Sequence, residues 1–148
     1  MNGPDAFSLP ARDAVNPLLQ PWAAPYALPP FAALQAEHFA PALALAMQQH
    51  RSELDAIAAQ PGAPTFDNTL ARFDASGRLL ARLEAVFYNL CASETSPALQ
   101  QAQRQLARPL AAHGNAVYMH AGLFARIDAL YTRRAELGLA AEPLRLLE

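Results

Sequence analysis

The sequence predicts an all-α protein, in which about four antiparallel helices and a truncated fifth follow an extended, proline-rich N-terminal arm. Three observations lead to this fold class. Apolar residues recur three and four positions apart over long stretches, prolines and glycines separate these stretches, and no period-two run of β-branched residues indicates a strand. The sequence also contains no internal repeat of about 34 residues, which argues against a helical repeat array. We therefore expect one helical domain.

The N-terminal arm is rich in proline, because seven of the 13 prolines fall within the first 30 residues. Proline fixes φ and removes a backbone donor, so this arm is expected to be extended. We predict that residues 1–15 form a disordered tail and that residues 16–148 form the helical domain. Trp22 and Tyr26 are expected to pack against the helices, because their burial would offset the cost of ordering the arm.

The first helix is predicted over residues 36–59, where one apolar stripe follows the helical period. The members of this stripe are Phe39, Leu43, Met47, His50, Leu54 and Ile57. Pro41 falls in the first turns, where a missing N–H costs little. Prolines and a glycine within residues 60–64 are expected to end the helix.

The second helix is predicted to begin at Thr65, a suitable N-cap residue, and its apolar stripe extends to Leu90. The members of this stripe are Phe66, Leu70, Phe73, Leu80, Leu83, Phe87 and Leu90. Gly77 lies on the same side of the helix. Glycine costs about 1 kcal/mol relative to alanine in a helix, so we expect another helix to approach closely at this point.

The third helix is predicted to begin with Ser96 as N-cap and Pro97 at the first helical position. Its apolar stripe consists of Leu99, Leu106, Leu110, His113 and Val117. Pro109 lies within the helix and removes the hydrogen bond to the carbonyl of Gln105. A kink near Gln105 is therefore expected.

The fourth and fifth helices are predicted after Gly122, which interrupts the third stripe. The fourth helix is expected to carry one stripe, formed by Phe124, Ile127, Tyr131 and Arg134. Gly138 is its predicted C-cap. The fifth helix begins at Glu142 and Pro143, and no stop signal follows before Glu148, so we expect the chain to end inside this element.

Composition excludes several classes of protein. The net charge is −2 with both signs interspersed, so neither a nucleic acid partner nor a nucleic-acid-binding surface is expected. We expect no signal peptide, because the first residues show neither a basic nor an apolar segment, and no apolar run of about 18 residues could span a membrane. Cys91 is the only cysteine, so no intramolecular disulfide can form, and this fits a reducing compartment. We therefore expect a cytoplasmic protein.

The four histidines do not form a metallopeptidase motif. None is followed by glutamate and no two are four residues apart, so the His-Glu-x-x-His pattern of a zinc peptidase is missing. His113 and His120 are separated by roughly 10 Å along a helix, which is too far to share a metal, and we expect ordinary packing or surface positions for both. His50 is expected at the core edge with a hydrogen bond, and His38 in local capping.

The remaining candidate residues also have ordinary interpretations. Cys91 is expected to be a buried, inert thiol. Three arginines, at positions 126, 133 and 134, share one helix with Asp128 and Glu136. A solvated charged face is the expected role of these arginines, and contact with peptide carboxylates is the alternative. No residue is assigned a catalytic, cofactor-binding or metal-binding role.

Several short motifs, taken in order, resemble a known family. They lie at residues 16–19, 28–31, 37–42 and 65–69. Together they are similar to the N-terminal region of the thimet-oligopeptidase-like zinc metallopeptidases, in the branch of oligopeptidase A and peptidyl-dipeptidase. The later stretches 123–131, 133–139 and 144–148 look closer to peptidyl-dipeptidase.

The resemblance implies that this chain is the N-terminal helical part of a larger peptidase and forms one wall of a deep channel. In that family the channel admits short peptides, and zinc is bound by the His-Glu-x-x-His motif and a later glutamate. No position here matches that motif, so zinc is expected in the parent protein outside this chain, and none in the fragment. The parent is expected to cleave short peptides, releasing C-terminal dipeptides.

Two further expectations concern partners. A free-standing helical module that binds a partner helix in an apolar groove is the alternative function. If the chain is instead part of a larger protein, its outer faces should expose apolar area that later sequence would cover. We then predict that the isolated chain self-associates through the second helix and the C-terminal segment.

Overall fold

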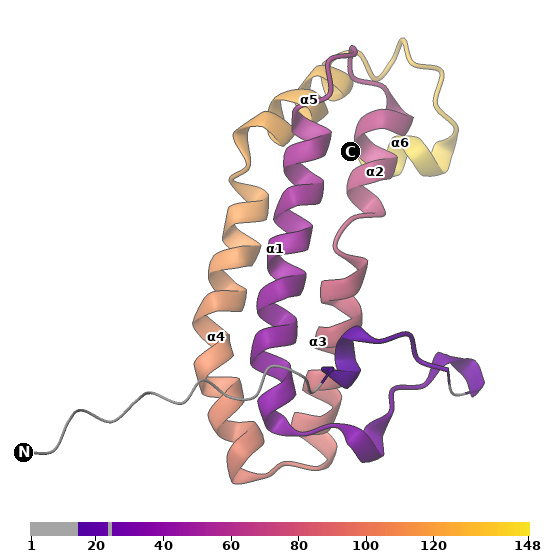
Figure 1. The fold of residues 1–148 in the computed structure, drawn as a ribbon. Coiled ribbons are helices and arrows are strands. Elements are labelled where there is room, and N and C mark those ends of the chain that lie inside the picture. Colours follow the sequence, from indigo (N-terminus) through magenta and orange to yellow (C-terminus); the bar gives the residue numbers. More distant parts are fainter. Residues whose placement is uncertain (1–14, 24) are drawn as a thin grey trace, which may run out of the picture.

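The computed structural model describes residues 15–23 and 25–148, and in these ranges all regular structure is helical (Figure 1). The prediction of an all-α fold is confirmed. The longer helices are α1 (Phe39–Ala58), α3 (Arg78–Ser93), α4 (Pro97–Tyr118) and α5 (Ala121–Thr132), and the shorter ones are α2 (Ala71–Asp74) and α6 (Ala141–Leu147). The predicted disordered tail falls outside the described residues, apart from Val15.

Three helices lie side by side and form the body of the molecule. α1 lies between α3 and α4 and contacts both (Figure 1). α3 runs antiparallel to α1, and a short turn then reverses the chain so that α4 runs parallel to α1 (Figure 1). α5 crosses the far end of α1, beside α2 and α6 (Figure 1). We call this far end, with residues 60–70 and 121–148, the upper end.

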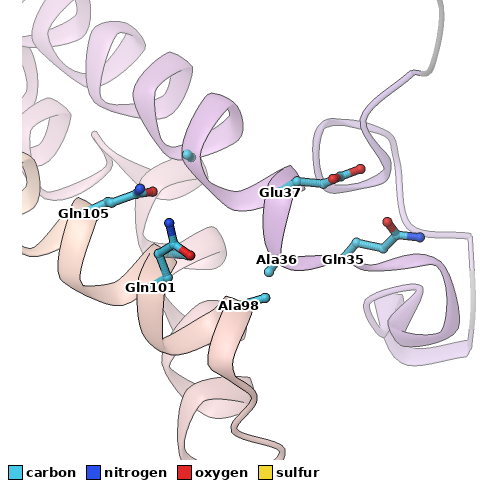
Figure 2. Close-up of a pocket in the computed structure, with 8 residues that line it drawn as sticks. Gln35, Ala36, Glu37, Ala98, Gln101 and Gln105 are labelled. Atoms are coloured by element: carbon cyan, nitrogen blue, oxygen red, sulfur yellow. The ribbon is translucent and has the colours of Figure 1, made fainter. Parts of the chain in front are cut away.

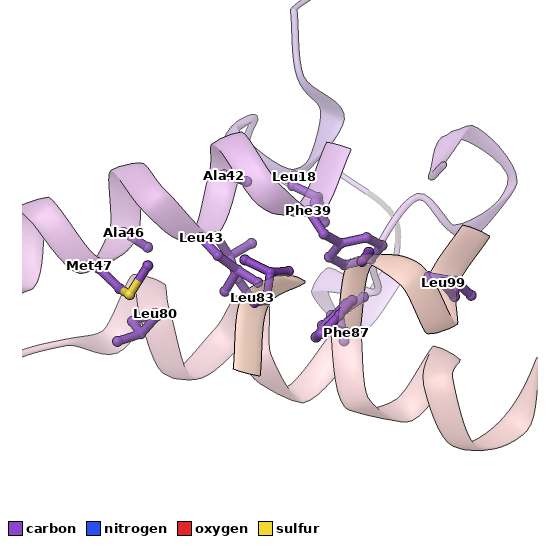
Figure 3. Close-up of a cluster of buried hydrophobic side chains, with 13 residues drawn as sticks. Leu18, Phe39, Ala42, Leu43, Ala46, Met47, Leu80, Leu83, Phe87 and Leu99 are labelled. Carbon is purple, nitrogen blue, oxygen red and sulfur yellow. The ribbon is translucent and has the colours of Figure 1, made fainter. Parts of the chain in front are cut away.

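The body is held together by one contiguous apolar cluster. Its buried members are Leu18, Phe39, Ala42, Leu43, Ala46, Met47, Leu80, Leu83, Val86, Phe87, Leu99, Ala102 and Leu106 (Figure 3). At its centre the rings of Phe39 and Phe87 lie 4.9 Å apart between their centroids. The predicted stripes of the first and third helices supply five of these residues, and the predicted second stripe supplies Leu80, Leu83 and Phe87. The predicted inner faces of α1 and α4 are therefore confirmed.

The predicted second helix is broken into three pieces. A π-helical turn (Phe66–Leu70) leads into α2, and α3 starts only after Gly77. Gly77 has φ +67°, in the left-handed region, so a continuous helix through it is impossible and that part of the prediction was wrong. Thr65 does cap the first turn, because its hydroxyl accepts a hydrogen bond from the Asn68 N–H at 3.1 Å.

The break coincides with a close approach, as expected for Gly77, but the approaching group is a side chain of α1. A Cβ at Gly77 would lie 2.9 Å from His50 Cε1. The N–H of Gly77 also donates to Glu53 Oε2 at 2.8 Å. The second helical stretch is therefore interrupted at the point where the His50 and Glu53 side chains of α1 contact Gly77.

Helix α4 begins as predicted and passes through Pro109 without interruption. Ser96 accepts a hydrogen bond from the Leu99 N–H at 3.2 Å, and Pro97 occupies the first helical position. Both Pro109 and Gln105 are exposed, so water can solvate the Gln105 carbonyl that lost its donor. Figure 1 draws α4 as one helix through this point, and a bend short of a break remains a prediction.

The predicted stripe of the fourth helix is confirmed for Ile127, which packs against both small apolar clusters of this end, and was wrong for Phe124 and Tyr131. Phe124 and Tyr131 are 65% and 42% exposed. The buried face of α5 instead carries Leu123, Arg126 and Leu130. Two small apolar clusters form there. One contains Leu54, Ile57 and Leu123, and the other contains Leu70, Leu130 and Leu147.

The last elements follow the prediction in part. α5 ends at Thr132, and Gly138 takes the left-handed conformation only after an intervening turn, so it does not cap α5 directly. α6 starts at Ala141, next to the predicted Glu142 and Pro143. Its Leu147 is buried in the second small cluster, which ties α6 to α5.

The N-terminal arm consists of short 3-10 turns at Pro17–Leu19, Pro25–Ala27, Phe31–Ala33 and Ala36–His38. Leu18 is fully buried in the body. Trp22 is half-buried against the same cluster, as expected, and the Arg82 guanidinium carbon lies 4.4 Å from its ring centroid. The prediction for Tyr26 was wrong, because this side chain is 96% exposed in a turn with φ +61° that carries it away from the helices.

In the described residues, no helix combines the length and the apolar character that crossing a bilayer requires.

Candidate functional site

Two histidines from distant parts of the sequence meet between α1 and α4. His50 Nδ1 lies 3.0 Å from His113 Nε2, and the ring centroids are 5.1 Å apart. Each residue lies on the apolar stripe predicted for its helix, which brings the two rings to the inner side of both helices. The expectation of a hydrogen-bonded histidine at the core edge is confirmed for His50.

The pair belongs to a longer series of hydrogen bonds. His50 Nε2 lies 3.2 Å from Ser76 Oγ, and that hydroxyl donates to the Phe73 carbonyl at 2.6 Å. At the other end, Arg51 Nη1 lies 3.5 Å from His113 Nδ1. We call this series, from Arg51 through His113, His50 and Ser76 to the carbonyl of Phe73, the histidine chain. It joins α1, α4 and the turn between α2 and α3.

The surroundings favour neutral imidazoles. Burial lowers the pKa of His50, and the nearby Glu53 carboxylate offsets this only in part. Burial also lowers the pKa of His113, and the positive charges of the His50 and Arg51 side chains lower it further. Because His113 is itself buried, both rings are held in a site that disfavours a second proton.

A groove of about 330 Å³ opens beside the histidine chain. It is lined by His50, Phe73, Leu80, Glu84, Leu110, His113, Gly114, Val117 and Tyr118. Burial raises the pKa of the Glu84 carboxyl in this groove. The groove therefore combines apolar walls with three titratable side chains and a phenol.

This site does not suit a zinc ion. Among the described residues, no group of three or more His, Cys, Asp or Glu side chains is placed to hold a metal. Every ring nitrogen of His50 and His113 already faces a hydrogen-bond partner, and a guanidinium faces one of them. A structural or catalytic zinc needs at least three protein ligands, so the residues present here do not fit it.

Arg126 forms a second polar site, which the sequence did not predict. This side chain is 8% exposed and crosses from α5 to the segment before α2. Its donors reach the carbonyls of Gln60 and Gly62 at 2.9 and 3.1 Å, Asn68 Oδ1 at 3.0 Å and Thr69 Oγ1 at 3.2 Å. Arg126 is thus neither on a solvated charged face nor free to contact a peptide carboxylate.

The other two arginines of this group lie outside the buried site. Arg133 is exposed. Arg134 folds back on the end of its own helix, where it donates to the Tyr131 carbonyl at 2.8 Å and lies 4.0 Å from the centroid of the Tyr131 ring. The charged-face interpretation therefore holds for Arg133 alone.

Two further histidines act as caps. His38 Nδ1 accepts a hydrogen bond from the Gln35 N–H at 3.1 Å, which confirms its predicted capping role. His120 Nδ1 accepts from the Leu123 N–H at 3.1 Å and so caps α5, while its Nε2 lies 3.0 Å from Asp55 Oδ1. Cys91 is half-buried against the body, and burial raises the pKa of its thiol.

A separate groove of about 390 Å³ lies between the segment before α1 and the start of α4 (Figure 2). It is lined by Gln35, Ala36, Glu37, Ala40, Ala98, Gln101, Ala102 and Gln105. Alanines keep this groove open, and the polar side chains of Gln35, Gln101 and Gln105 surround it (Figure 2).

Known peptidases are similar in sequence to this chain, although no family model matches it. The chain is 40% identical over 134 residues to the dipeptidyl carboxypeptidase of Escherichia coli (strain K12), a match that covers 90% of this chain and 20% of that protein. The corresponding protein of Salmonella typhimurium is 39% identical over 135 residues, again covering 20% of its length. Oligopeptidase A of E. coli is 29% identical over 109 residues, which cover 74% of this chain and 15% of that protein.

The chain thus spans about a fifth of the length of these relatives. The match extends over nearly all of the described helices, and it involves the same two enzymes that the short motifs resemble. The homologues of this chain are therefore dipeptidyl carboxypeptidase and oligopeptidase A, of the thimet oligopeptidase family, and the chain matches about one fifth of the first.

Proposed function

We propose that this chain is the N-terminal channel-wall domain of a cytoplasmic zinc metallopeptidase that cleaves short peptides and releases their C-terminal dipeptides. The observation that carries the proposal is the 40% identity to dipeptidyl carboxypeptidase over 90% of the chain. Zinc and the groups that activate water lie outside this chain. The role of the present residues is to shape the space through which peptides reach them.

The architecture is compatible with such a wall. A body built on one apolar cluster gives a firm scaffold, and the Gln- and Ala-lined groove of Figure 2 offers amide donors and acceptors beside small side chains. An extended peptide backbone needs such partners for its own N–H and C=O groups. Among the described residues, no group of three or more His, Cys, Asp or Glu side chains is placed to hold a metal ion, so the zinc of the proposal is expected outside this chain.

A chimera tests the proposal. The segment of E. coli dipeptidyl carboxypeptidase that aligns with this chain is replaced by the residues of this chain, and dipeptide release from a blocked tetrapeptide is measured. We expect the chimera to retain activity. The same enzyme without that segment is the control and should be inactive. A chimera that folds and binds zinc, but leaves the tetrapeptide intact, would argue for the alternative of a free-standing interaction module.

The chain by itself should be inactive. We expect no hydrolysis of a fluorogenic peptide, and less than one zinc ion per chain after dialysis, because the ligand set is missing from its sequence. Metal analysis and the peptide assay measure both. One tightly held zinc per chain would contradict the proposal.

Self-association of the isolated chain is also proposed. Large apolar side chains remain exposed on α3 and α6, where Tyr88 and Leu146 are 45% and 48% exposed, and such patches promote association. Light scattering over a concentration series should show a mass above that of the monomer. A monomer at every concentration would contradict this part of the proposal.

A further inference from the structure

We propose that the histidine chain is a pH-sensitive latch that holds α1, α4 and the α2–α3 turn together only while both imidazoles are neutral. The proposal is independent of the peptidase function. It rests on the direction of the hydrogen bonds, which can be worked out link by link.

The direction is fixed first at the serine end. The Ser76 hydroxyl has one proton, and it donates this proton to the Phe73 carbonyl at 2.6 Å. The hydroxyl oxygen can then only accept at its 3.2 Å contact with His50 Nε2, so Nε2 carries the hydrogen. A neutral His50 therefore has a bare Nδ1, which must accept from His113 Nε2–H across the 3.0 Å contact.

The arginine end requires the same direction. If Nε2 of His113 carries the hydrogen, its Nδ1 is bare and can accept from the Arg51 guanidinium, 3.5 Å away. Arginine has donors only, so a hydrogen on that nitrogen would face another donor. Both ends of the series thus select the Nε2–H tautomer of both rings, and every link is satisfied.

An added proton cannot be accommodated in this arrangement. A proton on His50 Nδ1 would face the Nε2–H of His113 unless that ring switches to its Nδ1–H tautomer, which would direct the hydrogen at Arg51. A second proton would leave two N–H groups facing each other across 3.0 Å. Two cationic rings at this distance would also repel each other in a half-buried site.

The charged groups around the rings do not remove this conflict. α1 places Arg51 and Glu53 beside the pair. The Glu53 carboxylate, which accepts from the Gly77 N–H at 2.8 Å, offsets the effect of burial on the pKa of His50 only in part. α3 contributes Glu84, whose carboxyl has a pKa raised by burial. α4 contributes the Tyr118 phenol, which lines the same groove. The turn contributes Ser76, which does not titrate in this range.

Opening of the latch would first release the α2–α3 turn. His50 packs against Gly77 so closely that a Cβ there would lie within 3.0 Å of the ring. Movement of this ring would remove the Ser76 contact together with the packing on Gly77. The link between α1 and the second helical stretch then depends on Glu53 and on the neighbouring apolar contacts.

The effect on stability has a defined sign. Both histidines have pKa values below 6.5 in the native state and ordinary values when unfolded. As the pH falls below 6.5, the two histidines bind protons in the unfolded chain but stay neutral in the native chain. The free energy of unfolding therefore decreases until the pH reaches the native pKa values. Each excluded proton raises the unfolding equilibrium constant by up to about tenfold per pH unit, or about a hundredfold for two.

Ring-nitrogen NMR on the 148-residue chain tests the direction of the hydrogen bonds. At pH 7.5, His50 and His113 should both show the Nε2–H tautomer, and both should remain neutral when the pH falls below 6.5. The R51Q variant removes the cation that faces His113 Nδ1 at an exposed position, and the pKa of the pair should shift upward. A His50 ring with hydrogen on Nδ1, or an unchanged titration in R51Q, would overturn the proposal.

Urea unfolding between pH 7.5 and 5.5 tests the stability effect. H113Q keeps a donor toward His50 but loses one titrating ring. The number of protons taken up on unfolding, measured from the pH dependence of the unfolding equilibrium constant, should therefore fall from two to one. H120N is the matched control. It also removes one histidine, but His120 does not belong to the histidine chain, and asparagine can still cap α5. Equal pH dependence in the wild type and H113Q would overturn the latch.

Discussion

The body and the upper end of the molecule are stabilised in different ways. In the body, α1, α3 and α4 enclose one cluster of 13 buried apolar residues (Figure 3). At the upper end, the buried apolar residues form two clusters of three, and a buried arginine lies beside them. The upper end therefore depends on directed hydrogen bonds where the body depends on apolar area.

The difference follows from what each region must connect. The body packs helices, whose backbone groups are already paired within each helix. The upper end must also hold residues 60–64, a connecting segment whose carbonyls have no helical partners. Arg126 supplies donors to two of these carbonyls and to Asn68 and Thr69. Such a network specifies one arrangement, and it is costly to leave partly unsatisfied.

The largest expected effect is in the body. Phe87 is fully buried and its ring packs on Phe39, so Phe87→Ala should lower the free energy of unfolding by about 3–5 kcal/mol. Urea unfolding measures this loss. Phe124→Ala is the matched control at an exposed position and should change stability by less than about 0.5 kcal/mol. Comparable losses in both variants would mean that the apolar cluster does not dominate the body.

The next effect concerns the polar site. Arg126→Leu removes the donors from four acceptors and should cost about 2–3 kcal/mol, because the buried Thr69 hydroxyl and the two loop carbonyls would lose the arginine as donor. Arg126→Lys keeps the charge but not the planar fork of donors, so it should recover only part of that loss. Urea unfolding is again the measurement, with Arg133→Gln as an exposed control. A leucine variant as stable as the wild type would show that this network is dispensable.

The sequence predicted the helices of the body well, because their signals are local. The cap Ser96 and the stripes of α1 and α4 depend on residues close in sequence, and the structure confirms them. The cap Thr65, at the upper end, is equally local and is confirmed as well. In α1 and α4 most large apolar residues recur on one face, with Leu45 and Tyr118 exposed away from it, so the buried side is clear from the pattern.

The upper end was harder to predict, because its signals depend on distant residues. In α5, apolar residues occupy adjacent positions, so a face through Leu123 and Leu130 and a face through Phe124 and Tyr131 both fit the helical period. Packing on α1 and on the turn before α2 decides between them. Arg126 has no local signal either, since all four of its acceptors lie more than 50 residues earlier in the chain.

The histidine chain lies between these two cases. His50 and His113 were both placed on the inner faces of their helices, and this much followed from periodicity. Their contact requires the parallel alignment of α1 and α4, and the Ser76 contact requires the break at Gly77. Neither the alignment nor the break can be deduced from helical spacing alone.

The smallest expected effect is the energetic coupling between an N-cap and Arg126, which should differ between the two regions. Thr65→Ala and Ser96→Ala each remove an N-cap and should each cost about 1 kcal/mol. The Thr65 cap fixes Asn68, whose side-chain oxygen also accepts from Arg126. Ser96 instead caps the start of α4, which lies at the opposite end of the body (Figure 1). Combined with Arg126→Leu, the Thr65 variant should therefore be non-additive by about 0.5 kcal/mol or more, and the Ser96 variant should be additive. Urea unfolding of both double variants measures this coupling, and equal additivity would mean that the cap and the arginine stabilise the upper end independently.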